Sequence, residues 1–220
     1  MLENLSQFLI NGGPVIWILL VLSIVAAAVI LFKSWFLWTL REQSTASIAA
    51  VLSHLKDGKR SEALMMAQGQ RNPRARLLAH LIPLLDHKEL SLDEIRDEAS
   101  RKARLLLASL TTNLKMLEVI AVVAPLIGLF GTVLGMIVAF QSMEAAGAAV
   151  NPAVLSGGIW QALLTTAAGM AVAIPVTMIH SWFDQSVQTT AILLQDDMDL
   201  VLTREALNRH SVVALKNVVR

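Results

Sequence analysis

Three polar side chains interrupt an uncharged, apolar stretch in the last third of the chain. Residues 159–175 read IWQALLTTAAGMAVAIP and include Gln161, Thr165 and Thr166. An unpaired polar group in hydrocarbon costs several kcal/mol, so these groups must contact another helix, water or a partner. Hydroxyl and amide groups can order water or bind a carboxyl group through hydrogen bonds. The pattern therefore predicts either a helix-to-helix contact or a water-accessible lining, and both interpretations stay open.

A second apolar run, VIAVVAPLIGLFGTVLGMIVAF at 119–140, combines a hydroxyl with small residues. Thr132 can line a polar path with Thr166, or it can bond back to its own helix, as intramembrane threonines often do. The spacing of Gly131 and Gly135 permits close approach of two helix backbones. Pro125 and Pro175 are expected to bend or loosen their helices. The other small residues predicted to pack helix on helix are Gly128 and Gly169.

Ionisable residues are absent from the middle of every apolar run. Glu118, His180 and Asp184 lie near the ends of the runs, where solvated interfacial positions are the default. A chain that moved protons by itself would place an ionisable group at mid-membrane, so this chain would need one from a partner. The sequence has no phosphate-binding loop, no zinc-protease motif and no catalytic triad pattern. It therefore indicates neither an enzyme nor a cofactor or metal.

Composition places most of the apolar residues in three segments. Hydrophobic residues make up 55% of the 220 and charged residues 16%, against about 25% charged in soluble domains. A helix needs about 20 apolar residues to cross a bilayer, so we predict an all-α integral membrane protein with spans at 14–36, 116–141 and 155–183. The first span lacks a basic N-terminal flank and is expected to be retained rather than cleaved.

The basic residues indicate the orientation in the membrane. Of 18 Lys and Arg residues, 14 lie between Lys33 and Lys115, and the other four follow Phe183. The positive-inside rule makes 37–115 and 184–220 cytoplasmic, and it leaves 1–13 and the 142–154 loop in the periplasm. The net charge of +1 gives no support to nucleic-acid binding.

The cytoplasmic segments show helical periodicity. Apolar residues recur every three or four positions from Leu92 to Leu117, and Ser91 with Glu94 makes a capping box. Because no breaker precedes Pro125, we predict one helix from Leu92 into the second span. A similar stripe from Val187 to Val201 predicts that the third span also continues as a cytoplasmic helix. Shorter helices are expected near 44–54 and 61–70, which together gives a cytoplasmic bundle.

The three apolar runs resemble the MotA/TolQ/ExbB proton-channel family, and most of all its ExbB/TolQ branch. The matching motifs are GGPVIWILLVLS at 12–23, P-x-x-G-L-x-G-T-V-x-G from Pro125 to Gly135, and A-L-x-x-T-A-x-G-x-x-x-A-I-P from Ala162 to Pro175. The resemblance implies a ring-shaped homopentamer in the bacterial inner membrane. It also implies an ExbD/TolR-like single-span partner that carries an intramembrane aspartate, and a TonB- or TolA-like protein that receives the work.

The resemblance also assigns roles to individual residues. Thr132 and Thr166 match pore-lining threonines, and Pro125 matches the proline of the second helix. Gln161 departs from the pattern, because many relatives have a glutamate there that is regarded as important to proton transfer. A glutamine can hydrogen-bond but cannot ionise, so this chain either relies on the partner's aspartate or is an altered form. The role of Glu118 is left open.

Three other functions compete with the proton-driven motor subunit that the resemblance implies. A non-conducting scaffold would use the same small residues for packing and its cytoplasmic helices for recruitment. A self-sufficient transporter is disfavoured by the missing mid-membrane charge and by three spans without inverted repeats. A flagellar stator of the MotA type is disfavoured by the short cytoplasmic region, although a stator of another system stays open.

Overall fold

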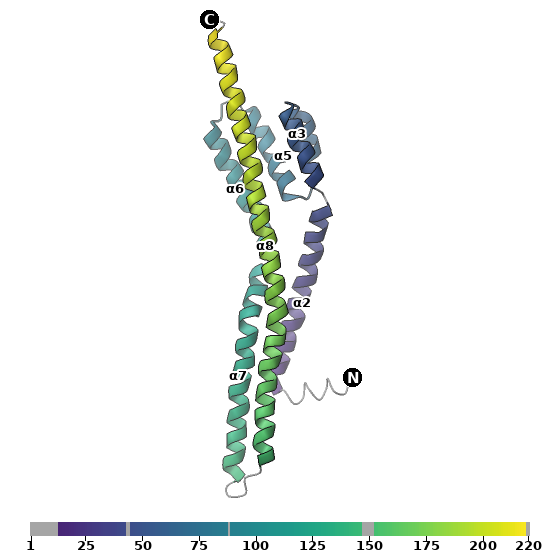
Figure 1. Cartoon of the computed structure of the whole chain (residues 1–220), viewed down its shortest axis with the longest axis vertical. Coiled ribbons are helices and arrows are strands. Elements are labelled where there is room, and N and C mark those ends of the chain that lie inside the picture. The colour runs from purple at the N-terminus through teal and green to yellow at the C-terminus, as the bar shows by residue number, and fades with distance from the viewer. Residues whose placement is uncertain (1–12, 43–44, 88, 147–151, 219–220) are drawn as a thin grey trace. The chain divides into compact units, whose positions relative to one another are not determined.

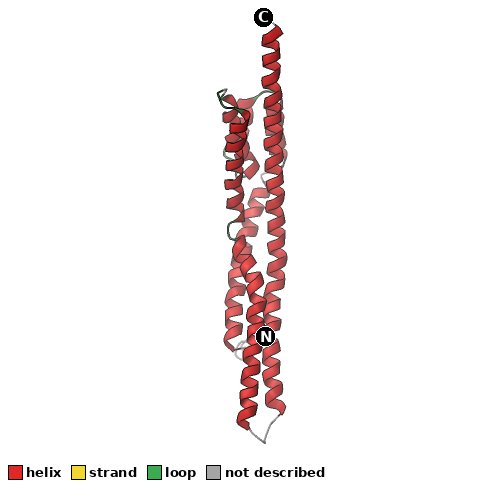
Figure 2. Ribbon diagram, turned by 90° about the vertical axis from the view of Figure 1, so that its left-hand side faces the viewer, coloured by secondary structure: helices red, strands yellow, loops and turns green. Residues whose placement is uncertain are grey.

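The computed structural model describes residues 13–42, 45–87, 89–146 and 152–218, and every regular element among them is an α-helix. Figures 1 and 2 show these helices and the chain path. The predicted all-α class is confirmed for the described part of the chain, whereas residues 1–12 and 147–151 of the predicted periplasmic segments lie outside it. The helices are α2 Gly13–Glu42, α3 Thr45–Lys56, α4 Arg60–Ala67, α5 Pro73–Asp86, α6 Leu92–Thr111, α7 Leu114–Ala146 and α8 Pro152–Val218.

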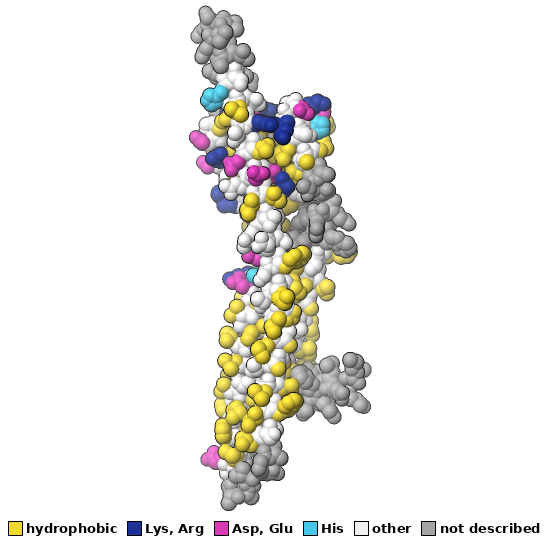
Figure 3. All heavy atoms as spheres, in the orientation of Figure 1, with side chains coloured by type: hydrophobic (Ala, Val, Ile, Leu, Met, Phe, Trp, Pro, Cys, Tyr) yellow, Lys and Arg dark blue, Asp and Glu magenta, His cyan; other side chains and the backbone are white. Residues whose placement is uncertain are grey.

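The chain divides into two compact units. The apolar unit comprises Met1–Lys33 and Asn113–Phe183, and the charged unit comprises Ser34–Thr112 and Asp184–Arg220. Three helices are long and apolar enough to cross a membrane, with candidate spans at Gly13–Trp35, Leu114–Ala145 and within Leu155–Ser211. On the face drawn in Figure 3, hydrophobic side chains cover the apolar unit, and most charged side chains lie on the charged unit. The prediction of three membrane-spanning helices is confirmed in length and composition.

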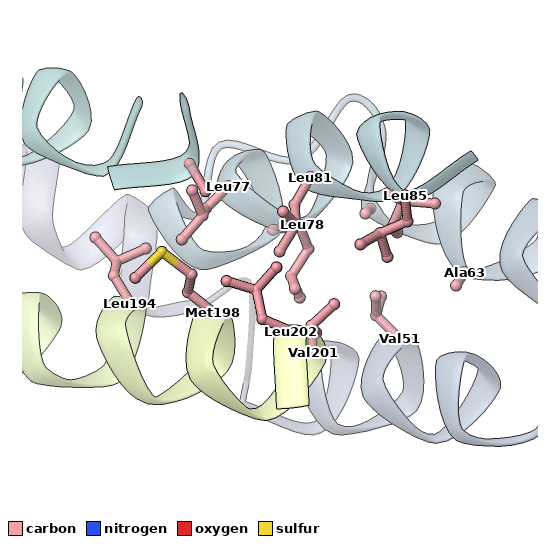
Figure 4. Close-up of a cluster of buried hydrophobic side chains, with 14 of the residues drawn as sticks. Val51, Ala63, Leu77, Leu78, Leu81, Leu85, Leu194, Met198, Val201 and Leu202 are labelled. Carbon is pink, nitrogen blue, oxygen red and sulfur yellow. The ribbon is translucent and has the colours of Figure 1, made fainter. Parts of the chain in front are cut away.

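A leucine-rich core holds the charged unit together. Leu77, Leu78 and Leu81 of α5 are fully buried, and the helical stripe of α8 packs with them through Leu194 and Met198. Figure 4 shows these side chains pointing toward one another between the two helices. Short helices were predicted only near 44–54 and 61–70, so α5 was not predicted. Asn72 caps this helix by accepting a hydrogen bond from the Arg74 amide, and Pro73 occupies its first turn.

The predicted continuous helix from Leu92 to Phe140 is wrong. Helix α6 ends at Thr111 and α7 begins at Leu114. Asn113 has φ 68°, a left-handed conformation that asparagine tolerates better than most residues and that often ends a helix. Residues of the predicted apolar stripe are nevertheless buried in both helices, Leu110 in α6 and Leu114 and Leu117 in α7.

The predicted continuation of the third span is confirmed, since α8 is a single helix of 67 residues. Pro175 lies inside α8 and Pro125 inside α7, and neither proline ends its helix. The break at Asn113 and the continuity at both prolines follow from local conformation. A proline removes one backbone hydrogen-bond donor, and the helix continues because the neighbouring backbone hydrogen bonds remain. A residue in the left-handed conformation cannot continue a right-handed helix, so the helix ends there.

The start of α6 is fixed by the predicted capping box. The Ser91 hydroxyl accepts a hydrogen bond from the Glu94 amide at 3.2 Å, and the Glu94 carboxylate accepts one from the Ser91 amide at 2.8 Å. We expect Ser91→Ala to destabilise the charged unit by about 1 kcal/mol, the usual effect of losing such a cap. Thermal unfolding of the full chain in detergent, followed by circular dichroism, measures the change. Ser53→Ala is the control, because the exposed Ser53 hydroxyl only donates to its own helix at Ala50, and an equal loss in both variants would contradict the prediction.

Candidate functional site

Helices α7 and α8 meet along a seam made of residues without bulky side chains. A Cβ atom added to Gly128 would lie 2.8 Å from the Thr165 carbonyl oxygen, and one added to Gly169 would lie 2.7 Å from the Ala124 carbonyl oxygen. Real Cβ atoms do not approach backbone this closely, so these two glycines let the helices touch backbone to backbone. Gly135 faces Ala162 in the same way, with the added Cβ 3.0 Å from the Ala162 methyl group.

The Thr165 side chain packs directly against Gly131, which we call its seat. A Cβ atom at Gly131 would lie 2.5 Å from Thr165 Oγ1 and 3.0 Å from a methyl group of Val15 on α2. Thr165 is only 2% exposed and Val15 5% exposed. Residues from all three apolar helices therefore enclose the Thr165 hydroxyl, and they do so because position 131 has no side chain.

Two hydroxyl groups of α8 approach one carbonyl oxygen of α7. Thr165 Oγ1 lies 2.7 Å from the Ala162 carbonyl oxygen of its own helix and 3.1 Å from the Gly128 carbonyl oxygen. Thr166 Oγ1 lies 3.2 Å from the same Gly128 oxygen. Thr166 is half-buried, so its side chain lies at the edge of the seam rather than inside it.

Thr132 and Gln161 lie near this group without joining it. The Thr132 hydroxyl donates to the Leu129 carbonyl of its own helix at 2.6 Å, and no hydrogen bond links it to Thr166 or Gln161 among the described residues. Gln161 is half-buried and faces the start of α2, where a Cβ atom on Gly13 would lie 3.6 Å from its amide nitrogen. Each of the three predicted pore residues keeps part of its surface accessible in a single chain, whereas Thr165 does not.

The remaining candidates have simpler surroundings. Glu118 is exposed and forms an ion pair with Lys115 at 3.0 Å, one turn away on α7. Pro175 is exposed and Pro125 is half-buried. The resemblance gives no role to Thr165, although its position one helical turn from both Gln161 and Gly169 places it on the same face of α8 as they are.

Ion pairs with α4 and α5 stabilise the position of the charged part of α8. Arg74 Nε and Nη2 each lie 2.7 Å from an oxygen of Asp197, whose side chain is 1% exposed. The hydrogen bond to Asp197 raises the pKa of Arg74 above its usual value, because it stabilises the charged guanidinium. A second group joins Arg60 to Glu205 and to Asp86, and Arg209 bonds to Glu205 at 3.1 Å. The predicted apolar stripe of α8 leaves Asp197 on another face of the helix, and its burial corrects that expectation.

Residues 57–196 match the sequence profile of the MotA/TolQ/ExbB proton channel family, which is more than half of the chain and includes the whole α7–α8 seam. The chain belongs to this family. The predicted family is thereby confirmed, and as a member of a proton channel family the chain is a membrane transport protein rather than an enzyme.

Several curated ExbB and ExbB-like proteins align with most of the chain. An ExbB homolog of Methanothermobacter thermautotrophicus is 29% identical over 78% of this chain and 60% of its own length. An ExbB-like biopolymer transport protein of Synechocystis is 34% identical over 77% of this chain and 66% of its own length. The biopolymer transport protein ExbB of Neisseria meningitidis is 29% identical over 88% of this chain and 91% of its own length. The chain thus spans less than two thirds of two of these relatives and most of the third.

Proposed function

We propose that this ExbB-family chain forms a pentameric ring in the bacterial inner membrane and works with an ExbD/TolR-like partner that supplies an intramembrane aspartate. The observation that carries this proposal is that the seam hydroxyls and the nearby Gln161 amide lie on apolar helices that hold no ionisable residue at mid-span. Such helices offer hydrogen bonds to a carboxyl group but have no proton-releasing group of their own.

The chemistry of the site fits a partner carboxyl group that changes its protonation. A neutral carboxylic acid can pass apolar surface at low free-energy cost, whereas a carboxylate needs hydrogen-bond donors. Thr132, Thr166 and Gln161 carry such donors and stay partly accessible in one chain. Alternation between the two protonation states, driven by the proton gradient, would move the partner within the ring and pass work to a TonB- or TolA-like protein.

Gln161 restricts what the chain itself contributes. Its amide can orient water or bind the partner's carboxylate, but it cannot take up or release a proton. In our proposal the partner's aspartate is therefore the only group that changes protonation near the seam. Gln161 contributes hydrogen bonds beside α2.

We expect Thr166→Val to lower partner-dependent proton flux about tenfold, because a hydrogen bond to a charged group is lost while the side-chain volume is kept. The chain and an ExbD-like partner are reconstituted into vesicles, and flux is followed with a pH-sensitive dye. Thr177→Val is the matched control, since the Thr177 hydroxyl donates only to Ala173 of its own helix, at 2.8 Å. Absence of partner-dependent flux from the unmodified chain would contradict the proposal.

A non-conducting scaffold is the second candidate, and the observation that favours it is the packing of the glycines and Thr165 within a single chain. In a scaffold, the hydroxyls of Thr132 and Thr166 are dispensable as long as volume is kept. Unchanged flux in Thr132→Val and Thr166→Val, beside unchanged ring assembly, would favour this alternative.

We propose that the N-terminus and the α7–α8 connection face the periplasm and that the charged unit is cytoplasmic. The chain has no cysteine, so single thiols can be introduced without background. In intact cells, we expect Glu144→Cys, exposed near the end of α7, to react with an impermeant maleimide. Asn208→Cys, exposed on α8, should react only after lysis. The opposite labelling pattern would overturn the orientation.

A further inference from the structure

The Gly128 carbonyl oxygen faces more hydroxyl donors than it needs. A carbonyl inside a helix already accepts the amide hydrogen of the residue four positions later, so one lone pair is left for a side chain. Thr165 Oγ1 at 3.1 Å and Thr166 Oγ1 at 3.2 Å both lie within reach of that lone pair. Each hydroxyl has a single proton to donate.

The shorter contact decides which hydroxyl donates to Gly128 in the isolated chain. Thr165 Oγ1 is closer to the Ala162 oxygen, at 2.7 Å, so its proton goes there, and Thr166 donates to Gly128. In this arrangement Thr166 offers only lone pairs to its surroundings. It can accept a hydrogen bond from water or from a protonated carboxyl group, but it cannot donate to a carboxylate.

We infer that Thr165 is a positioning residue that takes over the Gly128 carbonyl when Thr166 turns its proton toward an ionised carboxyl group. This inference rests on the proposed function, in which a partner carboxyl group alternates between its neutral and ionised forms beside Thr166. The Thr165 oxygen lies within hydrogen-bond distance of both carbonyls. The exchange therefore needs only rotation of hydroxyl hydrogens about their C–O bonds, and no covalent bond is formed or broken.

The enclosure of Thr165 suits it for this role. The side chain is 2% exposed, it rests on Gly131, and Val15 lies against the same seat. Because apolar and backbone groups surround the hydroxyl, its available acceptors are the carbonyls of Ala162 and Gly128. The single proton of Thr165 can be shared between the two carbonyls in a three-centre hydrogen bond, so neither carbonyl loses its hydroxyl contact entirely when Thr166 is released. Without Thr165, the buried Gly128 carbonyl would keep only its backbone hydrogen bond, which disfavours that release.

The hydrogen bonding of the Gly128 carbonyl can be measured directly, because Gly128–Leu129 is the only Gly–Leu pair in the sequence. Labelling glycine carbonyls with ¹³C and leucine amides with ¹⁵N gives one correlated NMR signal, whose ¹³C shift reports the hydrogen bonds of that oxygen. We expect the signal to keep its shift in Thr165→Val and in Thr166→Val, since either hydroxyl suffices. It should move upfield only in the double variant.

This measurement needs no partner and no transport, so it tests the inference separately from the proposed function. A Thr166→Val shift as large as that of the double variant would overturn the inference, because Thr165 would then not have replaced the lost donor. If Thr165→Val fails to assemble, Thr165→Ala takes its place in the double variant. Thr177→Val, on the same helix, should leave the signal unchanged.

Flux measurements with the partner give the functional arm of the test. We expect Thr165→Val to lower partner-dependent proton flux about fivefold, the factor that corresponds to one neutral hydrogen bond, and Thr165→Ser to restore it. The proton flux of the double variant should be no lower than that of Thr166→Val alone. If the two substitutions acted independently, their reductions in flux would multiply. Full flux in Thr165→Val beside reduced flux in Thr166→Val would overturn the inference and leave the proposed function standing.

Discussion

Asp197→Ala will destabilise the charged unit by about 3–5 kcal/mol, because it leaves the Arg74 guanidinium without its carboxylate in a largely buried position. Both partners are well shielded, with Arg74 at 16% and Asp197 at 1% side-chain exposure, and two bonds of 2.7 Å join them. Urea unfolding of the full chain in detergent measures the loss, and hydrogen exchange of the α5 and α8 amides locates it.

The control for this substitution is a neighbouring pair on the surface. Asp199→Ala breaks a pair with Arg96 at 3.2 Å in which both side chains are about half exposed, so the expected change is below about 1 kcal/mol. The double replacement Arg74→Met with Asp197→Leu should recover most of the lost stability, because no charge is then left buried. Equal effects of Asp197→Ala and Asp199→Ala would show that the buried pair is no stronger than a surface pair.

Gly128→Ala will weaken the association of α7 with α8 by about 3 kcal/mol, at the upper end of the range for overpacking. The added methyl group would lie 2.8 Å from the Thr165 carbonyl and 3.1 Å from the Thr166 Cα atom. Both obstacles are backbone of a continuous helix and cannot turn away, so the two helices must separate. The yield of assembled protein after detergent extraction and its melting temperature should both fall.

Gly157→Ala is the matched control for Gly128→Ala, because nothing lies within 4 Å of a Cβ atom added at position 157. The two substitutions make the same change to helix propensity, so the difference between them isolates the contact with α8. A melting temperature for Gly128→Ala equal to that of Gly157→Ala would contradict the backbone-to-backbone packing of the seam.

The regular spacing of apolar residues predicted which faces of the helices are buried. Buried Ile95, Ala99 and Leu106 lie on the predicted stripe of α6, and the stripe of α8 is buried at Leu194 and Met198. The three spans follow from apolar length alone. The break at Asn113 escaped prediction because it depends on one left-handed residue in a helical pattern, which leaves the periodicity on both sides unchanged.

The sequence pattern did not predict contacts between residues that lie far apart in the chain. Asp197 lies among the acidic residues Asp196 and Asp199, and only the approach of Arg74, 123 positions earlier, makes it a core residue. Thr165 and Thr166 are adjacent in sequence and chemically identical, yet one is enclosed and the other is partly accessible. Their roles differ because of what Gly131 and Val15 place around them, and a single sequence does not show such neighbours.

The seat of Thr165 over Gly131 links the substitutions that the two positions can tolerate. A side chain at position 131 would occupy the space of the Thr165 hydroxyl, 2.5 Å from the added Cβ atom. A genetic selection that starts from a defective Gly131→Ala chain should therefore recover second-site revertants in which residue 165 has become glycine. The two positions are expected to evolve as a pair, so an alignment of many descendants of this chain would show them changing together.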